Sequence, residues 1–157
     1  MPKITPFLWF DHQAEDAANF YVSIFPNSKI LGMSRVPPGA PGEVGAVQTV
    51  TFVIDGQEVT ALNGGSYQTL DEAFSFTVHC KDQAEVDDYW DALSEGGKTS
   101  VCGWTKDRFG LSWQITPTRL MELISDPDPA KASRAMGAMM QMTKIDIAKI
   151  EEAVAAG

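Results

Sequence analysis

The sequence predicts an α+β fold of two tandem β-α-β-β-β modules forming a cleft sheet, with helices at the C-terminus. The first observation is a repeat: FLWFDHQAE at residues 7–15 is matched by TVHCKDQAE at residues 77–85. Both copies pass from a short strand-like run through an acidic turn to Gln-Ala-Glu. The second observation is strand alternation with hairpin signals after each copy, which indicates antiparallel neighbours. The third is a change to helical spacing after residue 128.

These modules are too small to bury their cores well alone, so we expect them to pack together as one domain spanning residues 1–157. The first module covers about residues 1–66 and the second about residues 72–125. A helical tail covers about residues 128–157. A cleft between the modules is then the expected place for a ligand.

The first module starts with a buried strand at residues 4–10, which are bulky and apolar. Asp11 is the expected N-cap of a helix, which Pro26 ends because it cannot continue the hydrogen-bond ladder. The apolar residues of this helix recur at helical spacing: Ala14, Ala17, Ala18, Tyr21 and Phe25.

Three strands complete the first module. Residues 29–35 form the first, and the Pro- and Gly-rich residues 36–45 form a loop after it. Residues 47–54 and 58–63 form a hairpin, because Asp55-Gly56 between them is a strong turn signal.

The second module starts with an alternating strand from Phe74, with Ser75, Thr77 and His79 on its polar face. Asp82 and Glu85 form a capping box for a helix that buries Val86, Trp90 and Leu93 and ends at Gly96-Gly97. Strands follow at residues 100–104 and 111–116, and residues 121–124 are expected to close the sheet.

In the tail, Asp128 caps a helix at residues 130–142, and Pro129 takes its first position. Thr143 and Asp146 start a second helix that runs to residue 156. Four methionines crowd residues 136–142. They are expected to pack against the sheet or a partner subunit, the alternative being a Met-rich peptide-binding surface.

Charge and composition limit the partners. The net charge of −9 disfavours nucleic acid and anionic membranes, which recruit Lys and Arg. No apolar run approaches the roughly 20 residues of a membrane span, and no signal segment opens the chain, so we expect a cytoplasmic protein. Neither Cys80 nor Cys102 belongs to a CxxC pair. Cys80 fits a buried strand, whereas Cys102 lies in a loop where a thiol can react.

The whole chain resembles the vicinal oxygen chelate superfamily, which includes glyoxalase I, bleomycin-resistance proteins and extradiol dioxygenases. More narrowly it is similar to the PhnB-like branch, often labelled demethylubiquinone methyltransferase-like. The similarity is carried by the strings LWFD at 8–11, FPNS at 25–28, ALNGG at 61–65 and DRFGLSWQITP at 107–117. A methyltransferase activity has no support from the residues, since no Gly-rich nucleotide loop follows the first strand.

The resemblance implies divalent-metal ligands on the first and last strand of each module. The opening strands depart from this pattern, because the ligand positions fall on Thr5 and Ser75, or in the other register on Pro6 and Phe76. Gln114 matches the ligand position of the last strand, and its counterpart is Glu58 or Thr60, depending on register. His79 can substitute for a missing ligand. The cofactor is therefore either none or a divalent metal, held by Gln114, His79 and Glu58.

The polar strand faces are expected to line the cleft. Alternation puts Leu111, Trp113 and Ile115 on the face under a helix and the polar residues on the other. An apolar pocket with a few placed polar groups is typical of a small-molecule site. The predicted ligand-binding residues are Phe7, Trp9, Ser75, Thr77, Ser112, Gln114 and Thr116, with Trp9 and Trp104 able to stack on a flat ligand.

Two functions fit these features. The first is a metal-free protein that binds a small molecule, as resistance proteins of the superfamily do. The second is a metal-dependent enzyme (lyase-, isomerase- or dioxygenase-like) acting on a small oxygenated or aromatic metabolite, with His79 and Glu58 as catalytic acid and base. An interaction protein using the Met-rich tail ranks third. The resemblance also implies a homodimer.

Overall fold

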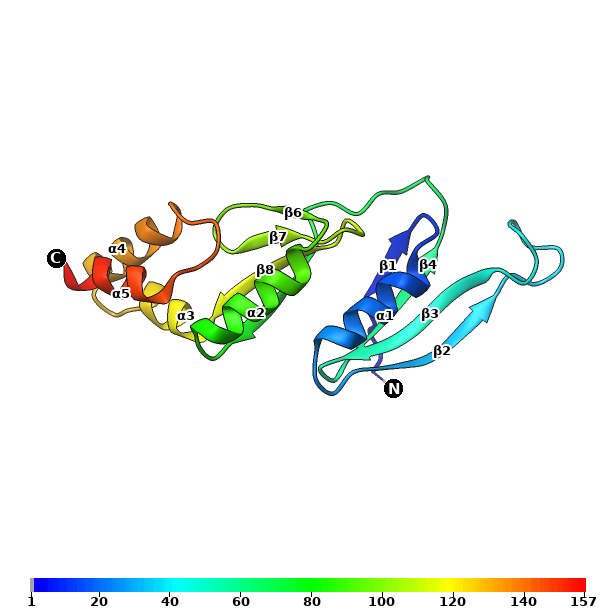
Figure 1. Cartoon of the computed structure of the whole chain (residues 1–157), viewed down its shortest axis with the longest axis horizontal. Helices are drawn as coiled ribbons and strands as arrows, with labels where there is room; N and C mark the ends of the chain where they lie inside the picture. Colours follow the sequence, from blue (N-terminus) through cyan, green and yellow to red (C-terminus); the bar gives the residue numbers. More distant parts are fainter. Residues whose placement is uncertain (1) are drawn as a thin grey trace. The chain divides into compact units, whose positions relative to one another are not determined.

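The computed structural model describes residues 2–157 and divides the chain into two compact units, Met1–Leu70 and Asp71–Gly157. Each unit is built around its own four-stranded sheet, and each sheet carries its strands and helix in the order β-α-β-β-β (Figure 1). The prediction of two tandem modules in an α+β fold is therefore confirmed.

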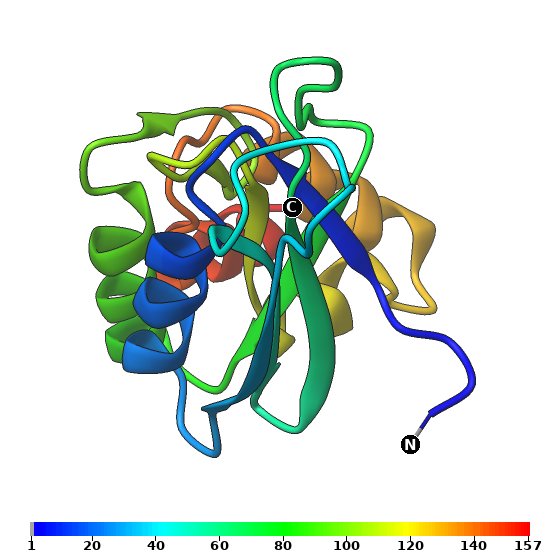
Figure 2. The ribbon, with the colours of Figure 1, turned by 90° about the vertical axis from the view of Figure 1, so that its right-hand side faces the viewer.

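The first unit contains β1 (Phe7–Phe10), α1 (Ala14–Ile24), β2 (Lys29–Arg35), β3 (Val47–Ile54) and β4 (Gln57–Asn63). The strand order is β1-β4-β3-β2; β1 runs parallel to β4 and the other pairs are antiparallel. α1 packs on one face of the sheet, mainly against β3 and β4 (Figures 1 and 2). Four of the five apolar residues predicted for this helix are buried: Ala14, Ala17, Ala18 and Tyr21. The fifth, Phe25, is half-buried and lies at the C-cap.

The predicted cap of α1 is wrong. Gln13, not Asp11, occupies the N-cap position, and it makes no side-chain capping bond. The first-turn N–H of Ala14 instead donates to Asn63 Oδ1 at 2.8 Å, so the end of β4 supplies the missing acceptor. The opening strand is also shorter than predicted: Pro6 lacks an N–H, and only its carbonyl joins the ladder, accepting from Thr60 at 3.0 Å.

The hairpin between β3 and β4 is as predicted. Asp55 and Gly56 both have positive φ, 44° and 81°, the conformation that a two-residue type I′ turn requires.

The second unit contains β5 (Ser75–Cys80), α2 (Gln83–Ser94), β6 (Lys98–Thr99), β7 (Trp104–Lys106) and β8 (Ser112–Pro117). The strand order is β5-β8-β7-β6, with β5 parallel to β8. α2 buries Val86, Trp90 and Leu93 as predicted, and Asp82 Oδ1 caps it by accepting from Glu85 N–H at 2.9 Å. In a capping box the Glu85 side chain accepts from the N–H of the N-cap residue, Asp82. Here Glu85 Oε1 accepts from Lys81 N–H instead.

The predicted strand at residues 100–104 is wrong. Those residues form a turn between β6 and β7, and only Trp104 belongs to a strand. The reason is local: Cys102 and Gly103 have φ of 59° and 82°, which a strand cannot accommodate.

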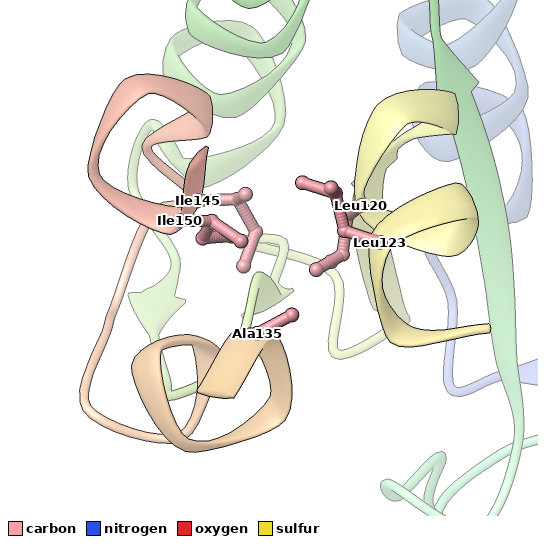
Figure 3. Close-up of a cluster of buried hydrophobic side chains, with 5 residues drawn as sticks. All are labelled: Leu120, Leu123, Ala135, Ile145 and Ile150. Carbon is pink, nitrogen blue, oxygen red and sulfur yellow. The ribbon is translucent and has the colours of Figure 1, made fainter. Parts of the chain in front are cut away.

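The chain ends in α3 (Thr118–Ile124), α4 (Pro129–Met139) and α5 (Ile147–Ala155). The predicted strand at residues 121–124 is wrong, because Leu120 and Leu123 lie one helical turn apart on α3. Both point into a cluster with Ala135, Ile145 and Ile150 (Figure 3). Asp128 and Asp146 cap α4 and α5, as predicted.

Met139 and Met142 pack against this cluster, while Met136 and Met140 are exposed. No helix in the described part of the chain is long and apolar enough to cross a bilayer.

Candidate functional site

The candidate site lies on the face of the second sheet opposite α2. The β5–β8 register pairs Ser75 with Ser112 and Thr77 with Gln114. The β7–β8 register pairs Trp104 with Gln114 and Lys106 with Ser112. Cross-strand partners share a face, so these side chains form one polar and aromatic surface, here called the open face.

The other face of this sheet is the packed one. Leu111, Trp113 and Ile115 are buried, as the alternation predicts. Thr105, the partner of Trp113, bonds Ser94 of α2 through their hydroxyls at 2.7 Å, so α2 covers this side. Since α2 takes the apolar face, the polar face of the sheet is left for a ligand.

A pocket of about 460 Å³ opens on the second unit. Its walls combine two ammonium groups, hydroxyls, a thiol and an indole. The lining residues are Glu72, Lys98, Thr99, Ser100, Val101, Cys102, Trp104, Thr105, Lys106 and Ser112. This volume suits a small organic molecule.

Ser112 is the distinctive residue of this pocket. Its side chain is 1% exposed, and its Oγ has no hydrogen-bond partner among the described residues. A buried hydroxyl without a partner costs roughly 1–3 kcal/mol, so native proteins rarely keep one without a use. A pocket-lining residue of the second unit therefore carries a desolvated hydroxyl group.

The neighbours of Ser112 are ordered by polar contacts. Gln114 Nε2 donates to Ser75 Oγ at 3.0 Å, which fixes the amide across β5 and β8. Lys106 Nζ lies 2.5 Å from Glu72 Oε1, and this hydrogen bond is the main reason that the pKa of Glu72 is lowered. One lysine of the pocket is thus held in place by an exposed carboxylate.

The predicted cleft residues fall into two groups. Ser75, Thr77, Ser112, Gln114 and Thr116 come together on the open face of the second sheet, with His79 beside Thr116. Phe7 and Trp9 belong to the first unit, where they pair with Thr60 and Leu62 of β4.

In the first unit, Trp9 is held within its own module. Its Nε1 donates to the Gly65 carbonyl at 2.9 Å. Glu58 Oε2 accepts from the Thr5 hydroxyl at 3.4 Å.

The register also decides which first-module residue corresponds to Gln114. Phe7 pairs with Thr60, and Thr77, its equivalent in the repeat, pairs with Gln114. Thr60 is therefore the counterpart of Gln114 in the first module. Glu58, two residues earlier, is the counterpart of Ser112.

Taken unit by unit, these residues do not fit a metal ion. His79 and Gln114 pair with Thr116 and Thr77 respectively, so they belong to different cross-strand rows. Among the residues described in either unit, no three His, Cys, Asp or Glu side chains gather as a metal site. The set of Gln114, His79 and Glu58, which draws on both units, stays a prediction.

Sequence reasoning missed most of this pocket, including Glu72, Lys98 and Lys106. The signal was present, because residues 107–110 mark a turn between two antiparallel strands. Pairing the strands across this turn places Lys106 opposite Ser112 and Trp104 opposite Gln114. The strand was predicted at residues 100–104 instead, which left Lys106 in the turn.

The chain is similar to a known family and to several solved structures. A family model described as 3-demethylubiquinone-9 3-methyltransferase matches residues 2–116. The PhnB protein from Bacillus cereus is 34% identical, with a TM-score of 0.67; the match covers 74% of this chain and 99% of that one. No curated protein matches the chain.

Two more distant structures share the fold. A protein from Pseudomonas aeruginosa is 19% identical, with a TM-score of 0.61 over 74% of this chain and 98% of that one. The fosfomycin resistance protein FosX from Listeria monocytogenes is 14% identical, with a TM-score of 0.51 over 74% and 93%. The family match ends at residue 116, so α3, α4 and α5 lie beyond it.

Proposed function

The chain belongs to the PhnB-like 3-demethylubiquinone-9 3-methyltransferase family with the vicinal oxygen chelate fold, and we propose that it binds a small molecule in the second-unit pocket. The observation that carries the proposal is that Ser112 lines the pocket and that its buried hydroxyl has no partner among the described residues. A bound acceptor oxygen would remove the desolvation cost of this group.

The lining also specifies the class of ligand. Two ammonium groups, of Lys98 and Lys106, outweigh the single carboxylate of Glu72 in the lining, which favours a negatively polarised ligand group. Trp104 offers a flat apolar surface. The proposed ligand is therefore a small oxygenated molecule with an apolar or aromatic part. Methyl transfer gains no support, because β1 passes to α1 through Asp11, His12 and Gln13, without a glycine-rich nucleotide loop.

A fluorescence titration tests the proposal with 1-anilinonaphthalene-8-sulfonate, an aromatic anion, as the probe. Ser112→Ala is expected to weaken binding about fivefold and Lys106→Met about tenfold, the usual range for one neutral and one charged hydrogen bond. Lys131→Met is the matched control, because it removes the same charge from an exposed position on α4. Equal affinity in all four proteins would overturn the pocket assignment.

The alternative function is a metal-dependent enzyme acting on a small oxygenated or aromatic metabolite. It is favoured by His79 and Gln114 sharing the open face. Metal content of untagged protein, before and after incubation with zinc, manganese, nickel and iron(II), separates the two functions. One tightly held ion that is lost in Gln114→Ala or His79→Ala would exclude the metal-free protein and favour the enzyme. Absence of retained metal, under conditions that load a related metalloenzyme, would favour the binding protein.

We also propose a homodimer. Large apolar side chains are exposed in both units, among them Phe7, Met33, Met136 and Met140. Burying such surface is the usual driving force for self-association. Light scattering coupled to gel filtration measures the mass directly, and a monomer at micromolar concentration would overturn this part.

A further inference from the structure

One wall of the pocket is formed by Ser100, Val101 and Cys102 of the turn between β6 and β7. Cys102 has φ of 59°, in the left-handed region that non-glycine residues rarely adopt, and Gly103 follows at 82°. Such a backbone persists only when its surroundings hold it in place. Within the turn, the Ser100 and Trp104 N–H groups donate to the Trp104 and Val101 carbonyls.

Residues 142–147, here called the strap, cover most of the connection from α4 to α5 and the first residue of α5. The strap also holds the turn in place. Cys102 N–H donates to the Met142 carbonyl, and Gly103 N–H to the Thr143 carbonyl, both at 2.8 Å. The Gly103 carbonyl in turn accepts from Ile115 N–H of β8 at 2.8 Å. Cys102 and Gly103 therefore lie between the strap and the sheet that carries Ser112 and Gln114.

Packing at Gly103 confirms how closely the strap approaches. A Cβ added to Gly103 would lie 3.0 Å from Ile145 Cγ1 and 3.0 Å from the Ile115 carbonyl oxygen. Ile145 itself is fully buried in the tail cluster of Figure 3. A displacement of the strap would therefore be felt at the turn.

The strap is anchored to α2 by one glutamine. Gln83 Nε2 donates to the Ile145 carbonyl at 2.9 Å, and Gln83 Oε1 accepts from Ile147 N–H at 2.9 Å. Lys144 adds an ion pair with Asp87 of the same helix at 2.9 Å. Gln13, the equivalent of Gln83 in the repeat, serves only as the N-cap residue of α1 and makes no side-chain capping bond.

We propose that the strap is a positioning segment for the pocket: by holding Cys102 and Gly103, it sets the wall against which the ligand packs. This inference rests on the proposed function of the pocket. The strap lies outside residues 2–116, which the family model covers. A segment of the tail therefore contributes to ligand affinity under this proposal.

Hydrogen exchange at the Cys102 and Gly103 amides tests the contact without any ligand. Gln83→Ala removes both anchoring bonds, so exchange at these two amides is expected to accelerate about tenfold. Ile147→Pro removes the Ile147 N–H together with the half-buried isoleucine side chain, and leaves the bond from Gln83 to the Ile145 carbonyl in place. Pro is tolerated there because Ile147 is the first residue of α5. It is expected to produce the same effect more weakly.

Arg119→Ala is the matched control. Arg119 bonds Glu151 at 2.7 Å and Glu122 at 2.9 Å, so its loss weakens the tail at a place away from the strap. Exchange at Cys102 and Gly103 is expected to stay at the wild-type rate. Equal acceleration in Arg119→Ala and Gln83→Ala would overturn the proposal, because general loosening of the tail would then explain both.

The titration with 1-anilinonaphthalene-8-sulfonate provides the second measurement. Gln83→Ala is expected to weaken binding three- to tenfold, while Arg119→Ala leaves it unchanged. If Ser112→Ala weakens binding and Gln83→Ala does not, the positioning role is wrong and the pocket assignment stands. If neither Ser112→Ala nor Lys106→Met weakens binding, the pocket assignment fails and the strap's effect on affinity fails with it.

Discussion

The indole Nε1 of Trp113 donates to Asp107 Oδ2 at 2.9 Å in the interior of the second unit, where Trp113 and Asp107 are 1% and 3% exposed. The other carboxylate oxygen, Oδ1, accepts from the N–H groups of Phe109 at 2.9 Å and Leu111 at 3.1 Å. One carboxylate therefore closes the turn between β7 and β8 and joins it to the core under α2. The open face depends on this turn, because it sets the register of Lys106 against Ser112.

Asp107→Ala is expected to lower the free energy of unfolding by about 3–5 kcal/mol, because three donors, two of them buried, lose a charged acceptor at once. Urea unfolding followed by tryptophan fluorescence measures this loss. Asp107→Asn is expected to cost less, since it keeps one acceptor oxygen. A loss below 1 kcal/mol in Asp107→Ala would show that the turn closes without the carboxylate.

Gly64 is expected to tolerate no side chain. A Cβ there would lie 2.3 Å from Trp9 Cε2, and Trp9 is also fixed by its bond to the Gly65 carbonyl. Gly64→Ala should therefore displace the indole, shift its fluorescence and lower stability by about 1–3 kcal/mol. Gly32→Ala is the control, because no atom of residues 2–157 lies within 4 Å of its added Cβ. Equal stability of the two variants would contradict the contact.

Ser112 and Ser75 face each other across β8 and β5, yet their removal should have opposite effects on the unliganded protein. Ser112→Ala removes a buried hydroxyl that has no partner in the described part of the chain, so stability is expected to rise by about 0.5–2 kcal/mol. Ser75→Ala removes the acceptor of Gln114 Nε2 and should lower stability by about 0.5–1.5 kcal/mol. Thermal unfolding without ligand measures both. Destabilisation by Ser112→Ala would indicate that the hydroxyl has a structural role.

Much of the fold follows from local pattern. The repeat, the alternation of β8 and the apolar spacing of α1 and α2 predicted the modules, because buried faces impose a period on the chain. The prediction failed where the deciding contact comes from far along the chain. Asn63 caps α1 from 49 residues away, and residues 142 and 143 hold the turn at Cys102 and Gly103.

Only part of the candidate site could be predicted, because some of its residues come together through contacts that strand alternation does not show. Gln114, Ser75 and Ser112 follow from strand alternation, which sequence shows directly. Lys98, Lys106 and Glu72 join them only through the position of β7, and that position depends on the Asp107 turn. The desolvation of Ser112 has no sequence signature, because it depends on the surrounding packing.

The two cysteines are expected to differ in reactivity. Burial, with smaller contributions from Glu85 and Asp82, raises the pKa of Cys80 to about 12, whereas Cys102 lines the pocket. A disulfide reagent at pH 8 should therefore label one thiol in the native protein and two after unfolding. Labelling should disappear in native Cys102→Ser. Rapid modification of Cys80 in the native protein would contradict its burial.

The raised pKa of Cys80 also predicts an alkaline dependence of stability. Below pH 9 the thiol keeps its proton in both states. Between pH 9 and about 12 the unfolded chain loses that proton while the folded protein retains it. Stability is therefore expected to fall by up to ~1.4 kcal/mol per pH unit from this group. Cys80→Ala should show a shallower alkaline loss, and identical slopes would contradict the assignment.

The ion pair between Lys144 and Asp87 is expected to make a small, pH-dependent contribution to stability. The hydrogen bond from Lys144, followed by that from Gln83, holds the pKa of Asp87 below its ordinary 3.8. The same contact with Asp87 raises the pKa of Lys144 above 10.5. Both side chains are about 40% exposed, so solvent screening limits the pair to ~0.2–1 kcal/mol at neutral pH.

The two shifts bound the pH window of this contribution. A lowered acid pKa stabilises the fold above pH 3.8, and the effect disappears as the pH falls through the folded-state value. A raised lysine pKa stabilises the fold below pH 10.5, and its effect disappears as the pH rises through the folded-state value. At pH 7, Lys144→Met should have a lower free energy of unfolding in urea than the wild type, and this deficit should be smaller at pH 2.5. Lys131→Met should match the wild type at both pH values. A Lys144→Met deficit that persists undiminished at pH 2.5 would show that the lysine acts by packing of its alkyl chain and not by its charge.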